Sequence, residues 1–430
     1  MKRLALILLL GACTEQATAP GVCPDFCPGG TIELTDTIFT DIIQRDSAYR
    51  GYVQAWEAEA MAVADVPGVV DSRAMFLMSS MITRIAATTT DTVPIVVDSA
   101  RLRVIVVRRD TGAVNLRLRL YLLPITLDST KTFDSLVTAF NVPPVDSVNV
   151  SDLLARPPIG DTATVRIWGD TIQTDSEGHT LQIASDSSLI VYFDLDGTQA
   201  PFVEADSGKL AYGVRVAQGA RASVFLGANE VFDRDPQIRW FFHYTIPDTV
   251  SATPDSVVNT SSLRETSFDS FVFNPPTPPL DDNLAVGGVP SARSLLRVAM
   301  PAFLHDSFDV VRATVIHVPV APVPGAPGDS FSVLARPVLT DLGAKSPLSN
   351  LSEFSGRTTI HIGAADTVRI ELSDLVRTWA LDTSATTAFV LGQVPEAATY
   401  TEIRFFSSRA PAFRPALHVT YVKRFPFGSP

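Results

Sequence analysis

Apolar and polar residues alternate with a period of two along several stretches of the chain. The clearest are residues 98–109 (DSARLRVIVVRR), 114–123 (VNLRLRLYLL), 367–372 (TVRIEL) and 415–421 (PALHVTY). This period is typical of a strand with one buried and one solvated face. Clusters of Asp, Ser, Thr, Pro and Gly between the stretches are typical of turns. Helical spacing is limited to short pieces such as 373–380 (SDLVRTWA). The pattern therefore predicts an all-β fold of antiparallel strands.

The two halves of the chain carry similar motifs in the same order. Both begin with an Ala-Val pair, a Val-Pro turn and an apolar strand, and both end with an aromatic strand and a Pro-led strand. The matching segments are 61–76 and 284–296, 98–106 and 309–318, 121–126 and 334–339, 222–226 and 402–406, and 236–244 and 415–421. Self-similarity over about 200 residues indicates two copies of one domain rather than a solenoid of short repeats.

We therefore expect two tandem antiparallel β-sandwiches, the first at 31–247 and the second at 263–424. Residues 248–262 (DTVSATPDSVVNTSS) are rich in Thr, Ser, Asp and Pro and suit a linker. Trp240 lies in phase with its apolar neighbours and is expected to be buried. The core expected for the second sandwich includes Leu295, Val315, Ile370, Trp379, Leu417 and Val419.

Composition narrows the class of protein. The chain has 430 residues, of which 46% are hydrophobic and 19% are charged, so it has enough apolar mass for real cores and is not a disordered chain. Its formal net charge is −12, which argues against binding to a nucleic-acid backbone. Three cysteines and six histidines are too few for a disulfide scaffold or a dense metal cluster.

The N-terminus has the organisation of a secretory signal. Two cations precede an apolar stretch at 4–10, which is shorter than the roughly 20 residues needed to span a bilayer. The block LGAC at 10–13 resembles the lipobox of bacterial lipoproteins. This resemblance implies removal of the signal peptide at 1–12 and acylation of Cys13, which would anchor the protein in a membrane. The alternative is a plain secretory signal with a chance cysteine.

Residues 13–30 are expected to form a tether between the lipid and the folded body. In the sorting rule of bacterial lipoproteins, an aspartate after the acylated cysteine retains the protein at the inner membrane, so Thr14 implies the outer membrane. Cys23 and Cys27 flank Pro-Asp-Phe, and an oxidising envelope would permit a disulfide between them. Free thiols and a redox or metal pair are the alternatives, although nearby histidines are absent. No later stretch of the sequence approaches a transmembrane helix.

The second half of the chain resembles the DNRLRE-type domain of secreted bacterial proteins. The resemblance rests on LAVGGVPSARSLLRVAMPAF at 284–303, VVRATVIHV at 310–318, VRIELSDLVRTWA at 368–380 and FFSSRAPAFRPALHVTYV at 405–422. Val298 stands where the family commonly has Phe, and Ala416 replaces an Arg. The first half matches loosely. The resemblance implies jelly-roll-like β-sandwiches related to carbohydrate-binding modules, and some members of the family bind acidic polysaccharides.

The polar faces of two predicted strands carry candidate ligand-binding residues. Arg101 and Arg103 project from one strand and Arg117 and Arg119 from the next, and we expect these two strands to be neighbours. A ladder of guanidinium groups could grip the carboxylates or sulfates of a polysaccharide in bidentate fashion. The alternative is a solvated face paired with the many aspartates. Trp168 is the tryptophan best placed by its RIWGDT context to be exposed and to stack on a sugar ring.

Signatures of metal binding and catalysis are weak. Asp194 and Asp196 (in DLDG) resemble part of a calcium loop, which keeps a structural calcium ion open as an alternative to no cofactor, but the EF-hand spacing is absent. Residues 328–331 (GDSF) resemble the nucleophile block of GDSL-type esterases, yet no histidine has an aspartate three residues before it. We interpret this block as a turn before a strand. No other catalytic motif was found.

These patterns favour a non-catalytic binding or adhesion protein. It would be anchored in the bacterial outer membrane through Cys13, facing the periplasm or the cell surface, with a polysaccharide or an envelope protein as its partner. A structural envelope protein, or a component of a surface complex, is the main alternative. The third and least favoured hypothesis is a glycan-degrading enzyme.

Overall fold

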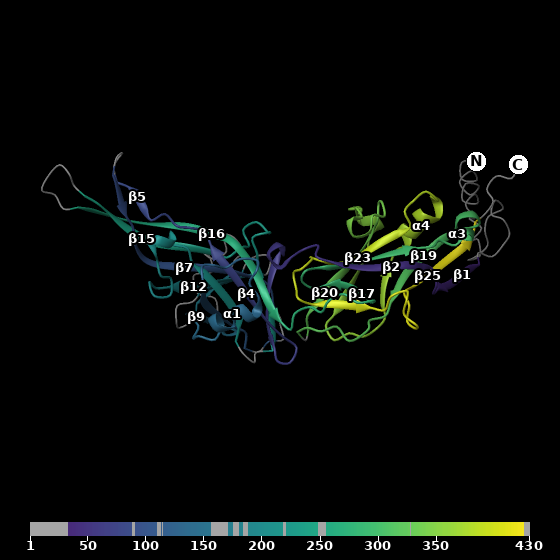
Figure 1. The fold of residues 1–430 in the computed structure, drawn as a ribbon, viewed down its shortest axis with the longest axis horizontal. Coiled ribbons are helices and arrows are strands. Elements are labelled where there is room, and N and C mark those ends of the chain that lie inside the picture. Colours follow the sequence, from purple (N-terminus) through teal and green to yellow (C-terminus); the bar gives the residue numbers. More distant parts are fainter. Residues whose placement is uncertain are drawn as a thin grey trace, which may run out of the picture.

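A computed structural model describes residues 33–87, 91–109, 113, 115–155, 171–174, 180–183, 188–217, 221–247, 255–326 and 328–424. The predicted signal peptide, the tether with Cys13, Cys23 and Cys27, and Trp168 lie outside the described residues. Within the described ranges the prediction of an all-β fold is confirmed, because antiparallel strands make up most of the two sandwiches (Figure 1).

The first sandwich is built mainly from residues 60–274. Its strands are β3 (Ala60–Val66), β4 (Val70–Met78), β7 (Val96–Arg109), β8 (Arg117–Leu123), β9 (Asp146–Asn149), β10 (Thr171–Thr174), β11 (Thr180–Ile183), β12 (Leu189–Leu195), β13 (Ala211–Val216), β14 (Ala222–Gly227), β15 (Gln237–Ile246) and β16 (Ser256–Asn274). A separate hairpin consists of β5 (Arg84–Ala86) and β6 (Thr92–Pro94), and two short helices are α1 (Phe133–Phe140) and α2 (Val150–Ala155).

The second sandwich uses the C-terminal part of the chain together with two strands from its N-terminal part. Its strands are β1 (Leu34–Phe39), β2 (Ile43–Arg50), β17 (Leu284–Gly287), β18 (Ala292–Val298), β19 (Phe308–His317), β20 (Ser330–Pro337), β21 (Gly356–His361), β22 (Val368–Glu371), β23 (Ala388–Val394), β24 (Glu402–Phe405) and β25 (Ala416–Lys423). Its helices are α3 (Ala302–Asp306) and α4 (Ser373–Leu381).

The two sandwiches share one pattern of strand pairing. In the first, β12, β7 and β15 are neighbours in one layer, and the other layer has the order β9-β8-β13-β4-β3-β14. In the second, the corresponding layers are β22-β19-β25 and β21-β20-β23-β18-β17-β24. The segments matched in sequence occupy equivalent strands: β3 and β4 correspond to β17 and β18, β7 to β19, β8 to β20, and β14 and β15 to β24 and β25.

The strands that precede each half of the chain complete the other sandwich. β1 pairs with β25 and β2 pairs with β18, so both belong to the second sandwich although they stand at the start of the described chain. β16 precedes the second half, but it pairs with β15 and β4 of the first sandwich. Because β15 and β4 are the equivalents of β25 and β18, the leading segments 34–50 and 256–274 occupy equivalent places and are exchanged between the sandwiches.

The structure therefore differs from the predicted domain boundaries. Residues 34–50 lie in the second sandwich rather than the first, and 263–274 lie in the first rather than the second. The expected linker at 248–262 is, from residue 256 onward, part of β16. That part of β16 pairs with β15 and is largely exposed, so its Ser- and Thr-rich composition is that of a solvated strand. Polarity alone does not distinguish such a strand from a linker.

Each sandwich has its own apolar core, as alternation predicted. Trp240 is fully buried in the first core. Trp379 on α4 and Val419 on β25 are buried in the second core. The remaining residues predicted for that sandwich are also buried, at 1% exposure or less: Leu295, Val315, Ile370 and Leu417. Burying such side chains supplies most of the stabilising free energy of a sandwich, at roughly 1.5–3 kcal/mol each.

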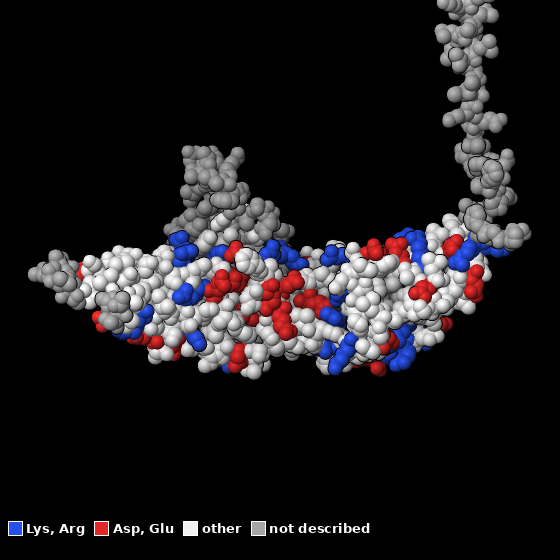
Figure 2. Space-filling view, turned by 90° about the horizontal axis from the view of Figure 1, so that it is seen from above, with Lys and Arg blue, Asp and Glu red and all other residues white. Residues whose placement is uncertain are grey.

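The two sandwiches lie end to end in an elongated body (Figure 1). β1 is at the end of the second sandwich that faces away from the first, and β2 and β16 both run toward the junction (Figure 1). On the face seen in Figure 2, acidic side chains gather near the middle of the body, with basic side chains around them. On this face the negative charge is therefore concentrated near the middle of the body rather than spread evenly.

One buried carboxyl group in β16 predicts a pH dependence of stability. Asp269 is only 1% exposed, and its Oδ2 accepts a hydrogen bond from the backbone N–H of Asn229 at 2.9 Å. Its Oδ1 has no hydrogen-bond partner among the described residues. Burial, together with the nearby acids Glu230 and Asp235, raises the pKa of Asp269 to about 7. The folded state therefore binds this proton more tightly than the unfolded state does.

We expect Asp269→Asn to stabilise the protein at pH 8. The pKa is raised on folding, so the wild-type residue costs stability as pH rises from about 4 toward 7, and the cost is complete above pH 7. At about 1.4 kcal/mol per pKa unit, the variant should gain a few kcal/mol at pH 8 and much less at pH 4. Thermal melting at both pH values measures this. Asp282→Asn, at an exposed position, is the control, and an equal effect of both variants would contradict the assignment.

Candidate functional site

The outer face of the first sandwich brings together two of the arginines singled out by the sequence. β12, β7, β15 and β16 lie side by side in this order, and their register aligns side chains in rows across the four strands. One row consists of Asp194, Arg101, Arg239 and Leu263, and the next of Tyr192, Arg103, Gln237 and Glu265. All of these residues except Asp194, together with Phe241 and Asp233, line a hollow of about 460 Å³. We call this surface the arginine face.

The guanidinium groups of the arginine face differ in their partners. Arg101 makes a bidentate pair with Asp194, with Nε 2.5 Å from Oδ1 and Nη2 3.0 Å from Oδ2, and this hydrogen bonding raises the pKa of Arg101. Arg103 donates from Nη2 to Asp233 Oδ1 at 2.8 Å. Arg239 has only a 3.4 Å hydrogen bond from Nη1 to Ser261 Oγ, and no ion-pair partner among the described residues. Arg239 is thus the cation most available to a ligand.

Arg117 and Arg119 do not belong to the arginine face, which corrects the expectation that their strand is the neighbour of β7. β8 pairs with β13 and β9 in the other layer of the sandwich. Arg117 donates from Nη1 to Ser147 Oγ at 3.1 Å within that layer. Alternation correctly assigned the polar face of each strand. It does not specify pairing partners, because the chain crosses from one layer to the other between β7 and β8.

The two weak calcium candidates are each engaged by neighbouring side chains. Asp194 is paired with Arg101. Asp196 accepts hydrogen bonds from the Thr198 hydroxyl at 2.6 Å and the Thr198 amide at 2.7 Å, and these bonds lower its pKa. Across the part of the chain that the structure describes, no group of three or more His, Cys, Asp or Glu is arranged to hold a metal ion. No helix in these ranges is long and apolar enough to cross a membrane.

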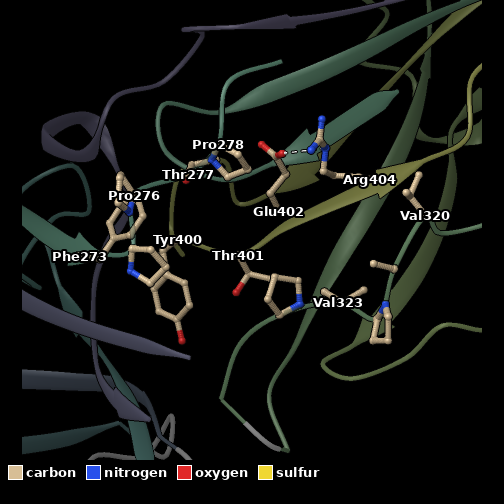
Figure 3. Close-up of a pocket in the computed structure, with 14 residues that line it drawn as sticks. Phe273, Pro276, Thr277, Pro278, Val320, Val323, Tyr400, Thr401, Glu402 and Arg404 are labelled. Atoms are coloured by element: carbon tan, nitrogen blue, oxygen red, sulfur yellow. Dashed lines mark ion pairs between the residues drawn. The ribbon is translucent and has the colours of Figure 1, made fainter. Parts of the chain in front are cut away.

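The junction between the sandwiches contains a second hollow, which the sequence analysis did not predict. It has a volume of about 300 Å³ and is shown in Figure 3. Its walls come from the end of β16 and the segment after it (Phe273–Pro278), the segment after β19 (Val320–Pro324), and the residues that lead into and begin β24 (Tyr400–Arg404). We call it the junction pocket. The proline-rich stretch NPPTPPL at 274–280 was its only signal in the sequence, because the pocket is assembled from three segments that are far apart along the chain.

A group of charged side chains lies at one side of the junction pocket. Arg50, the last residue of β2, pairs with Glu402 and donates from Nη2 to the Pro278 carbonyl at 3.0 Å. Arg404 pairs with Asp281, and its Nε lies 3.7 Å from Glu402 Oε1 (Figure 3). The Glu402 side chain is only 4% exposed. Burial raises the pKa of Glu402, and the charge of Arg50 opposes this effect.

The esterase-like block at 328–331 also lies at the junction. Ser330 begins β20, in line with the expected turn before a strand. Asp329 Oδ2 accepts a hydrogen bond from Ser223 Oγ of the first sandwich at 2.9 Å, and Asp329 Oδ1 lies 3.4 Å from Nη2 of Arg108. The Arg108 guanidinium also packs over the ring of Phe225, at 3.8 Å from its centre. These contacts give Asp329 a structural role in joining the sandwiches.

Comparison with known proteins gives no independent guide to either site, since no family model and no curated protein matches the chain.

Proposed function

We propose that the protein is a lipid-anchored, non-catalytic binding protein of the bacterial outer membrane that holds an acidic polysaccharide on its arginine face. The anchor is inferred from the LGAC block at residues 10–13. The observation that carries the binding proposal is the position of Arg239. It lies directly opposite Arg101 across β15 and β7, in a hollow that also contains Tyr192 and Phe241.

The chemistry of the arginine face suits an anionic sugar chain. A guanidinium group binds a carboxylate or sulfate through two parallel hydrogen bonds. Phe241 is 36% exposed and can pack against the apolar face of a sugar ring. The Arg101 and Arg103 pairs are partly exposed, and such pairs contribute little stability, so they can exchange partners with a ligand at low cost. The face also contains acidic residues, since Asp194 and Asp233 pair with two of its arginines and Glu265 lines the hollow, so Arg239 is the cation on which binding depends.

The proposal predicts that Arg239→Ala weakens binding of the full-length protein to an acidic polysaccharide. Loss of one charge-assisted hydrogen-bonding group costs roughly 1.5–3 kcal/mol, so the dissociation constant should rise about tenfold or more. Affinity electrophoresis in gels containing polygalacturonate or alginate measures the change, and the retardation should diminish with salt. Arg239→Lys should retain part of the binding.

Arg117→Ala is the matched control, since Arg117 is a partly exposed arginine on the other layer of the same sandwich. Equal retardation of the wild type and the Arg239 variant, or an equal loss in both alanine variants, would count against the arginine face as the binding surface. A neutral polysaccharide retained as strongly as an acidic one would contradict the role of the guanidinium groups.

A further inference from the structure

We propose that the arginine face continues along β15 as far as His243, and that the resulting surface selects a polysaccharide containing both acidic and neutral sugar residues. This inference rests on the proposed function and names the class of ligand more closely. We call the surface that runs from Arg239 through Phe241 to His243 the β15 strip. Its Arg239 end holds an acidic sugar, and its His243 end holds a neutral one.

The β15 strip is long enough to require a chain of sugars. Arg239, Phe241 and His243 alternate with the buried Trp240 and Phe242, so all three side chains project from the outer face of β15. A strand rises about 3.4 Å per residue, which separates Arg239 from His243 by about 14 Å. From the sandwich, β15 runs toward the end of the body remote from the junction (Figure 1). A single sugar ring cannot contact both ends of the strip, whereas a chain of several rings can lie along it.

An irregularity in β7 adds a carboxylate to the strip. Phe241 is opposite Ser99, but the next residue, Phe242, is opposite Val97, so Asp98 is an extra residue in the pairing of β7 with β15. Such β-bulges re-aim a side chain and are common beside functional sites. The Asp98 side chain is 47% exposed, so a ligand on the outer face can reach it.

The pair formed by Asp98 and His243 favours hydroxyl groups over an acid. Asp98 Oδ1 lies 2.8 Å from His243 Nδ1, which leaves Nε2 as the ring nitrogen for a ligand. With a neutral imidazole the pair carries one net negative charge, and with a protonated imidazole it carries none. In neither state does the pair attract an anion. Carboxylate oxygens and imidazole nitrogens both form hydrogen bonds with hydroxyl groups, which every sugar ring presents.

The strands beside this end of β15 present uncharged side chains. The residue opposite His243 is Val96 on β7 and Asn259 on β16, and Val257 and Ser261 lie on the same exposed face of β16. β6, which also packs against β15, contains only Thr, Val and Pro. The guanidinium groups of the strip are therefore at its Arg239 end, and its His243 end provides hydrogen-bonding groups without added positive charge.

Isothermal titration calorimetry on the full-length protein tests the proposal with three hexasaccharides. Hyaluronan alternates acidic and neutral rings, hexagalacturonate has an acid on every ring, and chitohexaose has none. The wild type should bind the hyaluronan hexasaccharide about fivefold more tightly than hexagalacturonate, because only the latter places a carboxylate against Asp98. Chitohexaose should bind about tenfold more weakly than hyaluronan, because it cannot pair with Arg239.

Two variants test the His243 end of the strip. Asp98→Asn removes the negative charge and keeps the shape of the side chain, so hexagalacturonate should bind about fivefold more tightly and hyaluronan about as in the wild type. His243→Ala removes a hydrogen-bonding group, so hyaluronan should bind about fivefold more weakly. Asp134→Asn, at an exposed position on α1, and His361→Ala, at an exposed position on β21, are the matched controls and should bind like the wild type.

The outcomes separate this inference from the proposed function. Equal or tighter binding of hexagalacturonate by the wild type, or unchanged binding by both the Asp98 and the His243 variant, would overturn the selection of a mixed polysaccharide. If Arg239→Ala still weakens binding of the acidic probes in that case, the arginine face remains the binding surface. If neither acidic probe binds, or if Arg239→Ala changes neither affinity, the proposed function fails together with the inference.

Discussion

Residues 275–424 expressed alone should fail to melt cooperatively, and a synthetic peptide of residues 33–50 should restore the transition. The isolated fragment contains nine strands of the second sandwich but lacks β1 and β2. Without them, the edge of β25 that pairs with β1 and the edge of β18 that pairs with β2 are both uncovered. Exposed strand edges of this kind also promote aggregation.

The missing segment is also part of the core of the second sandwich. Ile42 and Ile43 are 5% and 4% exposed, and burial of each contributes roughly 1.5–3 kcal/mol. Asp46 is fully buried at its side chain, where Oδ2 accepts from the Ser408 amide and Oδ1 pairs with Arg409 at 2.9 Å. Removing it would leave these donors without their partner. The sum is comparable to the net stability of a whole domain, which is about 5–15 kcal/mol.

Far-UV circular dichroism with and without the peptide measures the expected change. In the full chain, Ile43→Asp should abolish the melting transition of the second sandwich. Ile38→Asp should leave that transition in place, because Ile38 on β1 is 58% exposed. Cooperative melting of residues 275–424 without the peptide would show that the exchanged strands are dispensable. Restoration by a scrambled 33–50 peptide would show that the rescue is not due to strand pairing.

Val419→Asp should unfold the second sandwich of the full-length protein. Val419 is fully buried at the centre of β25, between Thr37 on β1 and Ala313 on β19. A carboxylate at this position has no partner to pair with, and burying it without one should cost about 3–5 kcal/mol. Limited proteolysis should then cleave within residues 284–424 while the first sandwich persists, and calorimetry should lose one of its transitions.

His418→Gln is the matched control for this substitution. His418 is the adjacent residue on the opposite face of β25, is 39% exposed at its side chain, and lies 3.3 Å from Asp36. Replacing it keeps a polar group on a solvated face, so the free energy of unfolding should change by less than about 1 kcal/mol. Comparable destabilisation by both variants would mean that the two faces of β25 are not distinguished as buried and solvated.

The strands and their faces could be predicted from the sequence because alternation reports burial directly. The patterns at 98–109 and 415–421 correspond to β7 and β25, with the expected valines and leucines buried. The shared order of motifs also predicted which strands of the two sandwiches would be equivalent. Even the short helical pieces expected around 373–380 lie at α4.

Strand partners could not be predicted in the same way, because a period of two identifies a face but not a neighbour. This is why Arg117 was grouped with Arg101, and why 34–50 was assigned to the first sandwich. The junction pocket was missed for a related reason: Arg50, Thr277 and Glu402 meet only through the exchange of leading strands. Arg239 was missed because a single arginine in the aromatic strand QIRWFFHY gives no signal until its register with β7 is known.

The entry of the chain at β1 has a consequence for how the molecule would stand on a membrane. β1 is at the end of the body remote from the first sandwich, so a lipid at Cys13 would place the later half of the sequence nearest the bilayer (Figure 1). The earlier half, with the arginine face, would then be held outermost. Along the membrane normal, the two halves would stand in the reverse of their order in the sequence. A force that pulls on the outer half would then act on the two connections at the junction, where the chain passes from one sandwich to the other.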